Sequence, residues 1–256
     1  RTYGQNRGTN WGCYDFNIHT DIFWLFAIEY ATLNSQKTFN ANLDASGYHQ
    51  GGLGIGVASF SNWNTYNSNN PFVPCGFTNS LGNQTGVKTF TLSAEQAAAY
   101  GSEHSESVPS YRGIENPFGH TWKWTDGFLG VGDGTKQAYY MSRTRAQYAS
   151  ALNDSYVKVG ESAGANGYSK AIIGSAQSMA QTQRNYGDIL IRDVTGSAST
   201  YFCDASYENH TAGVTYGMYV GGGASSIGSA GLVCGFLNAS LMFPSADLGS
   251  RLCWQK

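Results

Sequence analysis

The pentapeptide Gly160-Glu161-Ser162-Ala163-Gly164 has the G-x-S-x-G spacing that exposes a nucleophilic serine on a sharp turn in serine hydrolases. A strand-like run at 156–159 precedes it, and Asp193 and then His210 follow in the chain order that such a triad uses. The chain holds 33 glycines and many serines, so the string also arises by chance, and no His-Gly-Gly oxyanion motif precedes it. We therefore expect a glycine-rich loop here and keep a serine hydrolase at Ser162 as an alternative function.

The residues that bind metals or nucleotides lack the spacing that such sites need. The five histidines form no H-x-H or H-E-x-x-H pair, and the five cysteines form no C-x-x-C pair. Asp126 and Asp133 flank a glycine-rich loop that offers oxygens to calcium, but the loop does not match an EF-hand. The run GGLGIG at 51–56 departs from the G-x-G-x-x-G pattern. We expect no metal and no cofactor, and keep a calcium-dependent glycan lectin as an alternative.

The C-terminal quarter of the chain has the composition of a binding surface. Residues 193–250 contain no lysine and no arginine, and 201–234 consist mainly of glycine, tyrosine, serine and alanine. Antibody loops use the same combination, because rigid amphipathic rings supply contact area while small polar residues adapt their hydrogen bonds. An ordinary glycine-rich β-region with half-buried tyrosines has this composition too. Composition alone leaves both interpretations open.

The whole chain has the composition of a folded domain that does not bind nucleic acid. Aromatic residues make up 14% of it, whereas disordered chains are poor in them. The formal net charge is −2 and no basic block is present, so the field that attracts nucleic acid is missing. The longest strongly apolar run, 22–28, is far shorter than the roughly 20 residues of a membrane span. Because the sequence begins at Arg1, we expect a fragment or a processed product.

Two segments have the pattern of helices. Residues 20–34 are apolar at helical spacing, and because Leu25 and Ile28 extend the apolar surface to the other side, we expect burial nearly all round. The second helix is expected within 93–101, after a capping-box pattern and before a glycine stop. A weaker helical pattern spans 144–152.

Short β-type runs separated by glycine, asparagine and serine make up much of the remainder. They are 136–141, 156–159, 188–194, 214–220, 232–243 and 251–254. The runs do not alternate with helices, which argues against a doubly wound sheet or an α/β barrel. We expect one α+β domain over 1–256, with two main helices, small antiparallel sheets and long loops.

The runs GHTWKWTDG at 119–127 and GSRLC at 249–253 resemble two motifs, G-N-x-W-E-W-T and G-F-R-L, of the C-type-lectin fold of the formylglycine-generating-enzyme type. Within that fold the chain looks closest to the variable proteins of diversity-generating retroelements in Bacteroides-type phages and their hosts. The strings that carry this likeness are FWLFAIEY (23–30), PCGFTNSLGN (74–83), SYRGIENPFGHTWKWTDG (110–127) and GGGASSIGSAGLVCGFLNAS (221–240).

The resemblance implies a C-type-lectin-like fold with 1–19 as an N-terminal arm and 193–256 as a variable, ligand-displaying segment. In such systems adenine-directed mutagenesis of AAY codons makes Lys, Gln, Glu, Met and Trp scarce at variable positions, and none occurs between Tyr219 and Leu241. Formylglycine generation needs two cysteines close in sequence, whereas Cys234 and Cys253 are 19 apart. We therefore expect no enzyme of that kind.

The resemblance also implies which side chains face the ligand. They flank the glycine turns of the segment and are Tyr216, Tyr219, Ser225, Ser226, Ile227, Leu232, Val233, Cys234 and Phe236, with Met242 and Phe243 behind them. An upstream loop with Tyr201, Tyr207 and His210 is expected to join the same face. Trp122 and Trp124 are expected to fill the core, and Arg251 to pair with an acid or with backbone carbonyls near the end of the sheet.

Together these expectations describe a non-enzymatic receptor-binding or adhesion module of a phage tail tip or other virion appendage, or alternatively of a bacterial cell surface. The expected ligand is a bacterial cell-surface protein or glycan, and other virion subunits are expected as neighbours. The family analogy adds a homotrimer, and we expect neither nucleic-acid binding nor membrane insertion. A structural virion protein of the same fold without diversification is the main alternative.

Overall fold

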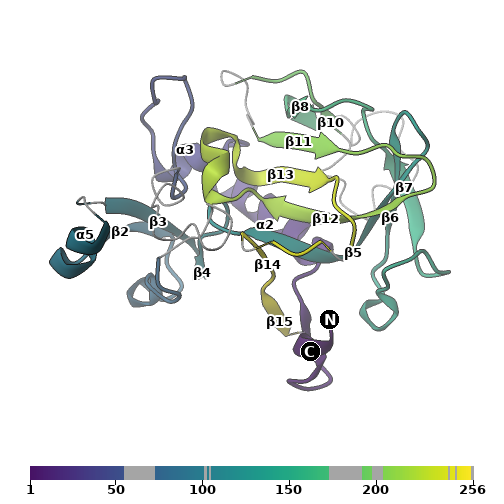
Figure 1. Ribbon diagram of the computed structural model, residues 1–256, viewed down its shortest axis with the longest axis horizontal. Coiled ribbons are helices and arrows are strands. Elements are labelled where there is room, and N and C mark those ends of the chain that lie inside the picture. The colour runs from purple at the N-terminus through teal and green to yellow at the C-terminus, as the bar shows by residue number, and fades with distance from the viewer. Residues whose placement is uncertain are drawn as a thin grey trace.

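The computed structural model describes residues 1–54, 73–100, 103, 105–172, 192–197, 204–241, 243–245 and 247–254. It combines few helices with mostly sheet, as expected for an α+β protein (Figure 1). The α-helices are α1 (Thr2–Gln5), α2 (Phe16–Tyr30), α3 (Ser35–Phe39) and α5 (Ala94–Tyr100). Three short 3₁₀ helices are η2 (Asn79–Leu81), η3 (Arg145–Gln147) and η4 (Ala224–Ser229). No helix of the described residues is long and apolar enough to cross a membrane.

The largest sheet follows the strand order β7-β6-β5-β12-β13-β11-β8, and β14 pairs with β5. Its strands are β5 (Trp122–Gly132), β6 (Gln137–Met141), β7 (Val157–Glu161), β8 (Gly167–Tyr168), β11 (Ala205–Glu208), β12 (Thr215–Gly221), β13 (Gly231–Leu237) and β14 (Leu248–Gly249). The pairs β11–β13 and β14–β5 are parallel and the other pairs antiparallel. The sheet curls, with α2 on one of its faces (Figure 1).

The described residues also form three smaller sheets. One joins β2 (Gly86–Thr91), β3 (Ser105–Tyr111) and β4 (Ile114–Glu115), and another joins β9 (Ala171–Ile172) to β10 (Arg192–Asp193). The third pairs β1 (Trp11–Cys13) with β15 (Leu252–Trp254), so segments from both ends of the chain lie side by side (Figure 1).

The residues at the two ends of helix α2 explain where the helix begins and ends. The Asp15 carboxylate accepts a hydrogen bond from the backbone N–H of Ile18 and caps the helix, which therefore starts four residues before the predicted position. It ends before Ala31, whose φ is 49°. The prediction of burial nearly all round is wrong: Leu25 is 54% exposed and Ile28 is 78% exposed. Only one stripe of α2 faces the sheet, so its other side stays uncovered in the described structure.

The main core lies between α2 and the inner face of the large sheet. Helix α2 contributes its aromatic stripe, and the sheet contributes large side chains from four strands; these are Phe16, Phe23, Phe26, Phe128, Tyr139, Met141, Tyr216, Met218, Val220, Leu232, Val233 and Leu237. Burial of this many large apolar groups is the main favourable contribution to folding. A second, smaller core lies beside the sheet of β2, β3 and β4.

The predicted strands are found in part. Strands β6, β7, β10, β12, β13 and β15 overlap predicted runs. Strand β13 ends at Leu237 rather than at 243, and 188–191 of the run that contains β10 lie outside the described residues. The long strand β5 was missed, because Gly127, with φ of 81°, interrupts its alternation of apolar and polar residues. Helix α5 matches the second predicted helix, whereas 144–152 contain only η3.

Residues 1–19 belong to the packed structure rather than to a separate arm. Residues 16–19 are the first turn of α2, and β1 pairs with β15. The Arg1 guanidinium forms an ion pair with Asp126 at 2.7 Å. Near the other end of the chain, Arg251 donates to the backbone carbonyls of Glu115 and Asn116, which confirms the prediction that it pairs with carbonyls.

Candidate ligand-binding face

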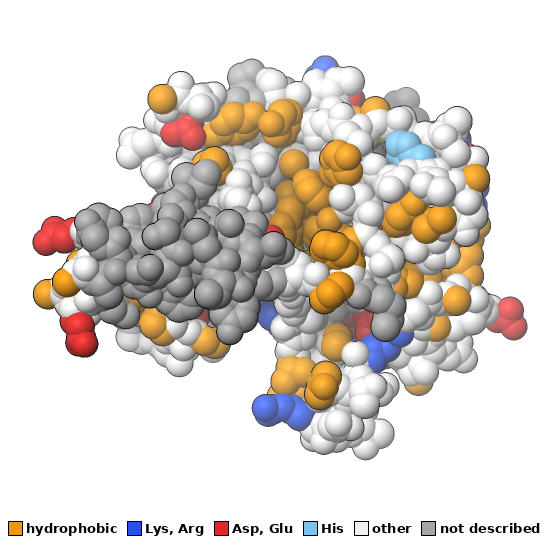
Figure 2. All heavy atoms as spheres, viewed as in Figure 1, with side chains coloured by type: hydrophobic (Ala, Val, Ile, Leu, Met, Phe, Trp, Pro, Cys, Tyr) orange, Lys and Arg blue, Asp and Glu red, His pale blue; other side chains and the backbone are white. Residues whose placement is uncertain are grey.

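Five aromatic side chains form a continuous band on the outer face of the large sheet, the face opposite α2. Four neighbouring strands supply them: Trp122 and Trp124 from β5, Tyr219 from β12, Phe236 from β13 and Tyr207 from β11. Figure 2 shows hydrophobic side chains gathered in the middle of this side of the molecule. We call these five residues the aromatic band.

The rings of the aromatic band touch one another in sequence across the strands. Trp124 and Trp122 both contact Tyr219 edge-on, at centroid distances of 5.2 and 4.9 Å. Trp122 lies 4.5 Å from Phe236, and Phe236 lies 5.6 Å from Tyr207. Edge-on and tilted contacts at such distances are favourable for aromatic pairs. Each ring is therefore held by its neighbours, which makes the band a rigid surface.

Exposure increases from the middle of the aromatic band to its β11 end. Trp122 and Tyr219 are buried, Phe236 is half-buried, and Tyr207 is 45% exposed. The Tyr219 hydroxyl donates to Asn238 Oδ1, and burial raises the pKa of this phenol above its ordinary value. The uncharged phenol and the amide therefore add polar groups to the apolar band.

Strand alternation decides which predicted site residues reach this face. In β12, Tyr219 points outward while its neighbours Met218 and Val220 enter the core against α2. In β13, Phe236 points outward and Leu237 inward. Near the start of β13, where the register against β12 shifts between Val220 and Gly221, the alternation is interrupted and the consecutive Leu232 and Val233 both enter the core.

Five predicted ligand contacts are buried, so they do not form an exposed surface in this structure. One of them, Tyr219 in the aromatic band, is 8% exposed. Tyr216, Leu232 and Val233 belong to the core against α2, with exposed fractions of 4%, 1% and 2%. Cys234 is fully buried beneath the aromatic band. The predicted β-type runs at 214–220 and 232–243 correspond to β12 and β13, which are central strands of the large sheet, and packing against α2 or beneath the aromatic band buries these side chains.

The remaining predicted contacts lie at the surface or at its margin. Ser225 is exposed, and Ser226 and Ile227 are half-buried, all three in η4. Helix η4 follows Gly223 directly. A β-carbon added at Gly223 would lie 3.2 Å from the Trp122 ring, so this part of the chain adjoins the aromatic band. Phe243 is 51% exposed. Met242 and Tyr201 lie outside the described residues.

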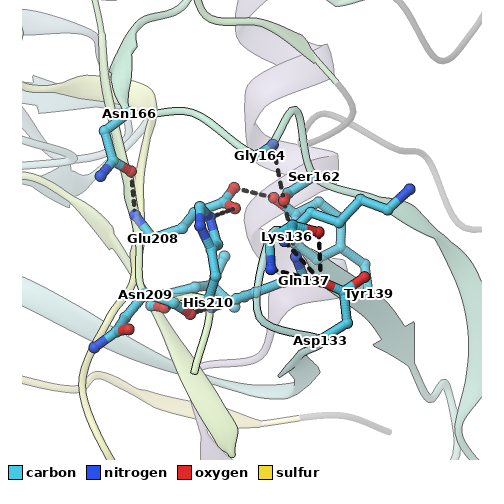
Figure 3. Close-up of polar contacts among 12 residues, drawn as sticks. Asp133, Lys136, Gln137, Tyr139, Ser162, Gly164, Asn166, Glu208, Asn209 and His210 are labelled. Carbon is cyan, nitrogen blue, oxygen red and sulfur yellow. Dashed lines mark hydrogen bonds and ion pairs between the residues drawn. The ribbon is translucent and has the colours of Figure 1, made fainter. Parts of the chain in front are cut away.

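A polar cleft of about 540 Å³ opens beside the Tyr207 end of the aromatic band. It is lined by Gly134, Tyr207, Glu208, Asn209, His210, Thr211 and Asn238. Glu208 is buried, accepts a hydrogen bond from the Tyr139 hydroxyl and lies 3.3 Å from His210 Nε2 (Figure 3). The predicted residue His210 is thus held at the cleft by a carboxylate that is itself anchored in the core.

Ser162 takes part in hydrogen bonds that hold a turn of the backbone. Its Oγ accepts hydrogen bonds from the backbone N–H groups of Gln137 at 3.0 Å and Gly164 at 3.3 Å (Figure 3). Among the described residues, no histidine or carboxylate is hydrogen-bonded to it, and His210 instead contacts Glu208. The pentapeptide therefore closes a turn beside β6, and the geometry supplies no general base at Ser162.

The two aspartates considered for calcium have other contacts. Asp126 pairs with Arg1, and Asp133 accepts hydrogen bonds from the backbone of Thr135 and Lys136. In the part of the chain that the structure describes, no three His, Cys, Asp or Glu side chains are grouped as metal ligands.

Sequence reasoning missed several residues of this face. Glu208 and Asn238 line the cleft, although neither was predicted as a contact. Trp122 was expected in the core and is buried, but it and the half-buried Trp124 belong to the aromatic band rather than to the core against α2. No local signal distinguishes these roles, because the outer face forms only when β5 pairs with β12.

Comparison of the chain with protein-family models, with curated proteins and with solved structures finds no match.

Proposed function

We propose that the chain is a non-enzymatic recognition module that binds a molecule of a bacterial cell surface through the aromatic band and its margin. The observation that carries this proposal is the continuity of the band: rings from four adjacent strands contact one another, and the outermost, Tyr207, is 45% exposed. Half-exposed aromatic groups near a polar cleft supply both apolar area and hydrogen bonds to a ligand.

The packing of the band supports binding with a small loss of entropy. Trp122 and Tyr219 are buried and hold Phe236 from below, so the exposed ring edges are already ordered before a ligand arrives. Rigid aromatic residues dominate the binding energy of many interfaces for this reason. Asn238 and His210 at the cleft add polar groups that orient a ligand.

The proposal includes the C-type-lectin-like scaffold, diversification of this face and a place at a phage tail tip or other virion appendage. These three parts of the proposal rest on the sequence resemblance, and the proposed receptor is a cell-surface protein or glycan. Assembly as a homotrimer would multiply a weak single-site affinity, because further attachments become effectively intramolecular. Light scattering of the full-length protein tests the assembly, and a monodisperse monomer would contradict it.

Binding of the fluorescently labelled protein to a panel of Bacteroides-type cells tests the recognition role. We expect Tyr207→Ser and Phe236→Ser to weaken cell binding by about tenfold, as loss of a central aromatic contact does. Tyr3→Ser is the matched control, because Tyr3 is 89% exposed and lies in α1. Equal binding by all three variants would contradict the proposal.

Sequencing of the gene across a growing population tests diversification. We expect substitutions at exposed or half-buried positions such as Tyr207, Ser225, Ile227 and Phe236, and unchanged codons for the buried Leu232. A uniform, low substitution rate over 201–243 would contradict diversification and favour a fixed receptor binder or a structural virion subunit. In a structural subunit, the aromatic band would be covered by neighbouring subunits in the assembled particle.

A further inference from the structure

Asp247 places a carboxylate beside the aromatic band. Its backbone carbonyl accepts a hydrogen bond from the backbone N–H of Trp122 at 2.9 Å, where β14 joins β5. A β-carbon at Gly223 would lie 3.2 Å from Trp122 Cδ1 and 3.8 Å from Asp247 Oδ2, so the carboxylate lies near the indole edge. The negative charge of Asp247 also adds to burial in raising the pKa of Tyr219.

This carboxylate has no cationic partner within the described residues. Asp247 Oδ1 accepts a hydrogen bond from the Ser245 hydroxyl, and no ion pair involves Asp247. No lysine or arginine occurs in 193–250. Lys123, which follows Trp122 in β5, points to the opposite face of the sheet. It is buried, and its ammonium group donates to the Pro117 carbonyl. Among the described residues, the outer face therefore offers a negative charge without a matching positive one.

A ligand that covers this face would remove water from the Asp247 carboxylate. Asp247 is half-buried and retains contact with solvent. A ligand that packs on the aromatic band would remove this solvent, and burial of a carboxylate without a partner is strongly unfavourable. A ligand that supplies a cation removes this penalty, because the cation pairs with the carboxylate.

We propose that the ligand is a protein that places an arginine side chain on Asp247 at the edge of the aromatic band; this rests on the proposed function. A guanidinium fits because it forms paired hydrogen bonds with a carboxylate and stacks on aromatic rings. The band crosses four adjacent strands, a spread that suits a protein surface better than a single small molecule.

Titration with acetyl-arginine amide tests this inference directly. The probe is added to the full chain while NMR follows the indole N–H signals of Trp122 and Trp124. We expect saturable shifts, with binding about tenfold weaker for the neutral isostere acetyl-citrulline amide and for the variant Asp247→Asn. Asp193→Asn is the matched control, because Asp193 lies in β10 and hydrogen-bonds with Thr195. We expect this control to bind like the native chain.

Three outcomes would overturn the inference: no saturable shift with the arginine probe, equal affinity for the citrulline probe, or unchanged affinity in Asp247→Asn. Tighter binding of glucosamine than of the arginine probe would replace the protein by an amino sugar as the source of the cation, and would also overturn it. The cell-binding assay separates the two proposals. Weak binding by Tyr207→Ser with unchanged binding by Asp247→Asn contradicts this inference alone, whereas unchanged binding by Tyr207→Ser contradicts the proposed function.

Discussion

Ile227 combines a β-branched side chain with φ of 47° and ψ of −129°, a backbone conformation that such residues rarely adopt. Its carbonyl accepts a hydrogen bond from Gln36 Nε2 at 2.8 Å, which helps to hold the loop in this form. Strained residues of this kind cluster at functional sites, where side-chain identity matters more than stability. This agrees with a contact role for Ile227 at the margin of the aromatic band.

We expect Ile227→Gly to raise the free energy of unfolding by about 1 kcal/mol, because glycine adopts this conformation without strain. Ile227→Val keeps the β-branch and serves as the control, with no gain expected. Urea denaturation of both variants measures the difference. Destabilisation by the glycine variant would contradict the presence of strain at this position.

Two histidines, the fully buried His19 and the half-buried His120, make stability depend on pH. Burial lowers the pKa of His19 to about 3, and burial together with the nearby Lys123 charge lowers that of His120 to about 3. His19 is held by the Tyr14 hydroxyl and the Leu232 carbonyl. Both imidazoles stay neutral in the folded state at pH 5, whereas the unfolded chain is protonated below its ordinary pKa of about 6.5.

The unfolded state therefore binds more protons between pH 6.5 and pH 3, and stability must fall as the pH falls through this window. At pH 5 the loss relative to pH 7 amounts to about 2 kcal/mol per histidine. Denaturation at the two pH values measures it in the variant Glu106→Gln. This background is needed because burial raises the pKa of Glu106 to about 7, and its protonation in the folded state adds stability as the pH falls. Titration of His19 and His120 near pH 6.5 in NMR spectra of the folded protein would contradict the expectation.

At the scale of elements, the two faces of the large sheet have different tasks. The inner face packs on α2 and supplies stability, whereas the outer face displays the aromatic band. The long strand β5 serves both, because it pairs with β6, β12 and β14 and carries two rings of the band. The face of the sheet on which a side chain lies therefore predicts how much its removal lowers the free energy of unfolding.

We expect Leu232→Ala to lower the free energy of unfolding by about 3 kcal/mol, since Leu232 is 1% exposed in the core. Tyr207→Ala on the outer face is expected to cost less than about 1 kcal/mol, because this ring is 45% exposed. Thermal or urea denaturation compares the two variants. Similar losses in both would mean that the outer face contributes to folding as much as the core does.

At the scale of the whole molecule, Gln36 joins segments far apart in the sequence. Its side chain is fully buried in α3 and donates to the carbonyls of Ile227 and Ala230 around η4. Its Oε1 accepts from the backbone N–H groups of Gly51 and Gly52. One amide thus ties the margin of the candidate site to the N-terminal half of the chain.

We expect Gln36→Leu to lower the free energy of unfolding by about 3 kcal/mol or more, because it leaves four backbone groups without their partner. Gln147→Leu is the control, since Gln147 is exposed at the end of η3. Hydrogen exchange of the Gly51 and Gly52 amides gives a local readout, and we expect faster exchange in Gln36→Leu. Unchanged stability and exchange would show that these hydrogen bonds contribute little.

Local patterns were sufficient to predict much of the element inventory. The apolar spacing of α2, the capping pattern before α5 and the short β-type runs all depend on neighbouring residues, so the sequence predicted them within a few positions. The α+β class and the pairing of Arg251 with backbone carbonyls were predicted as well. The start of α2 was misplaced, because its cap is Asp15 and not a residue near Thr20.

By itself the sequence determined that the C-terminal segment is rich in aromatic residues and free of lysine and arginine. Only the tertiary structure decided which of those residues reach the surface: Phe236 points outward, while the adjacent Leu237 enters the core. The physical reason is strand pairing and register. One position along a strand reverses the face of a side chain, and register is set by partners such as β5, about a hundred residues away in the chain.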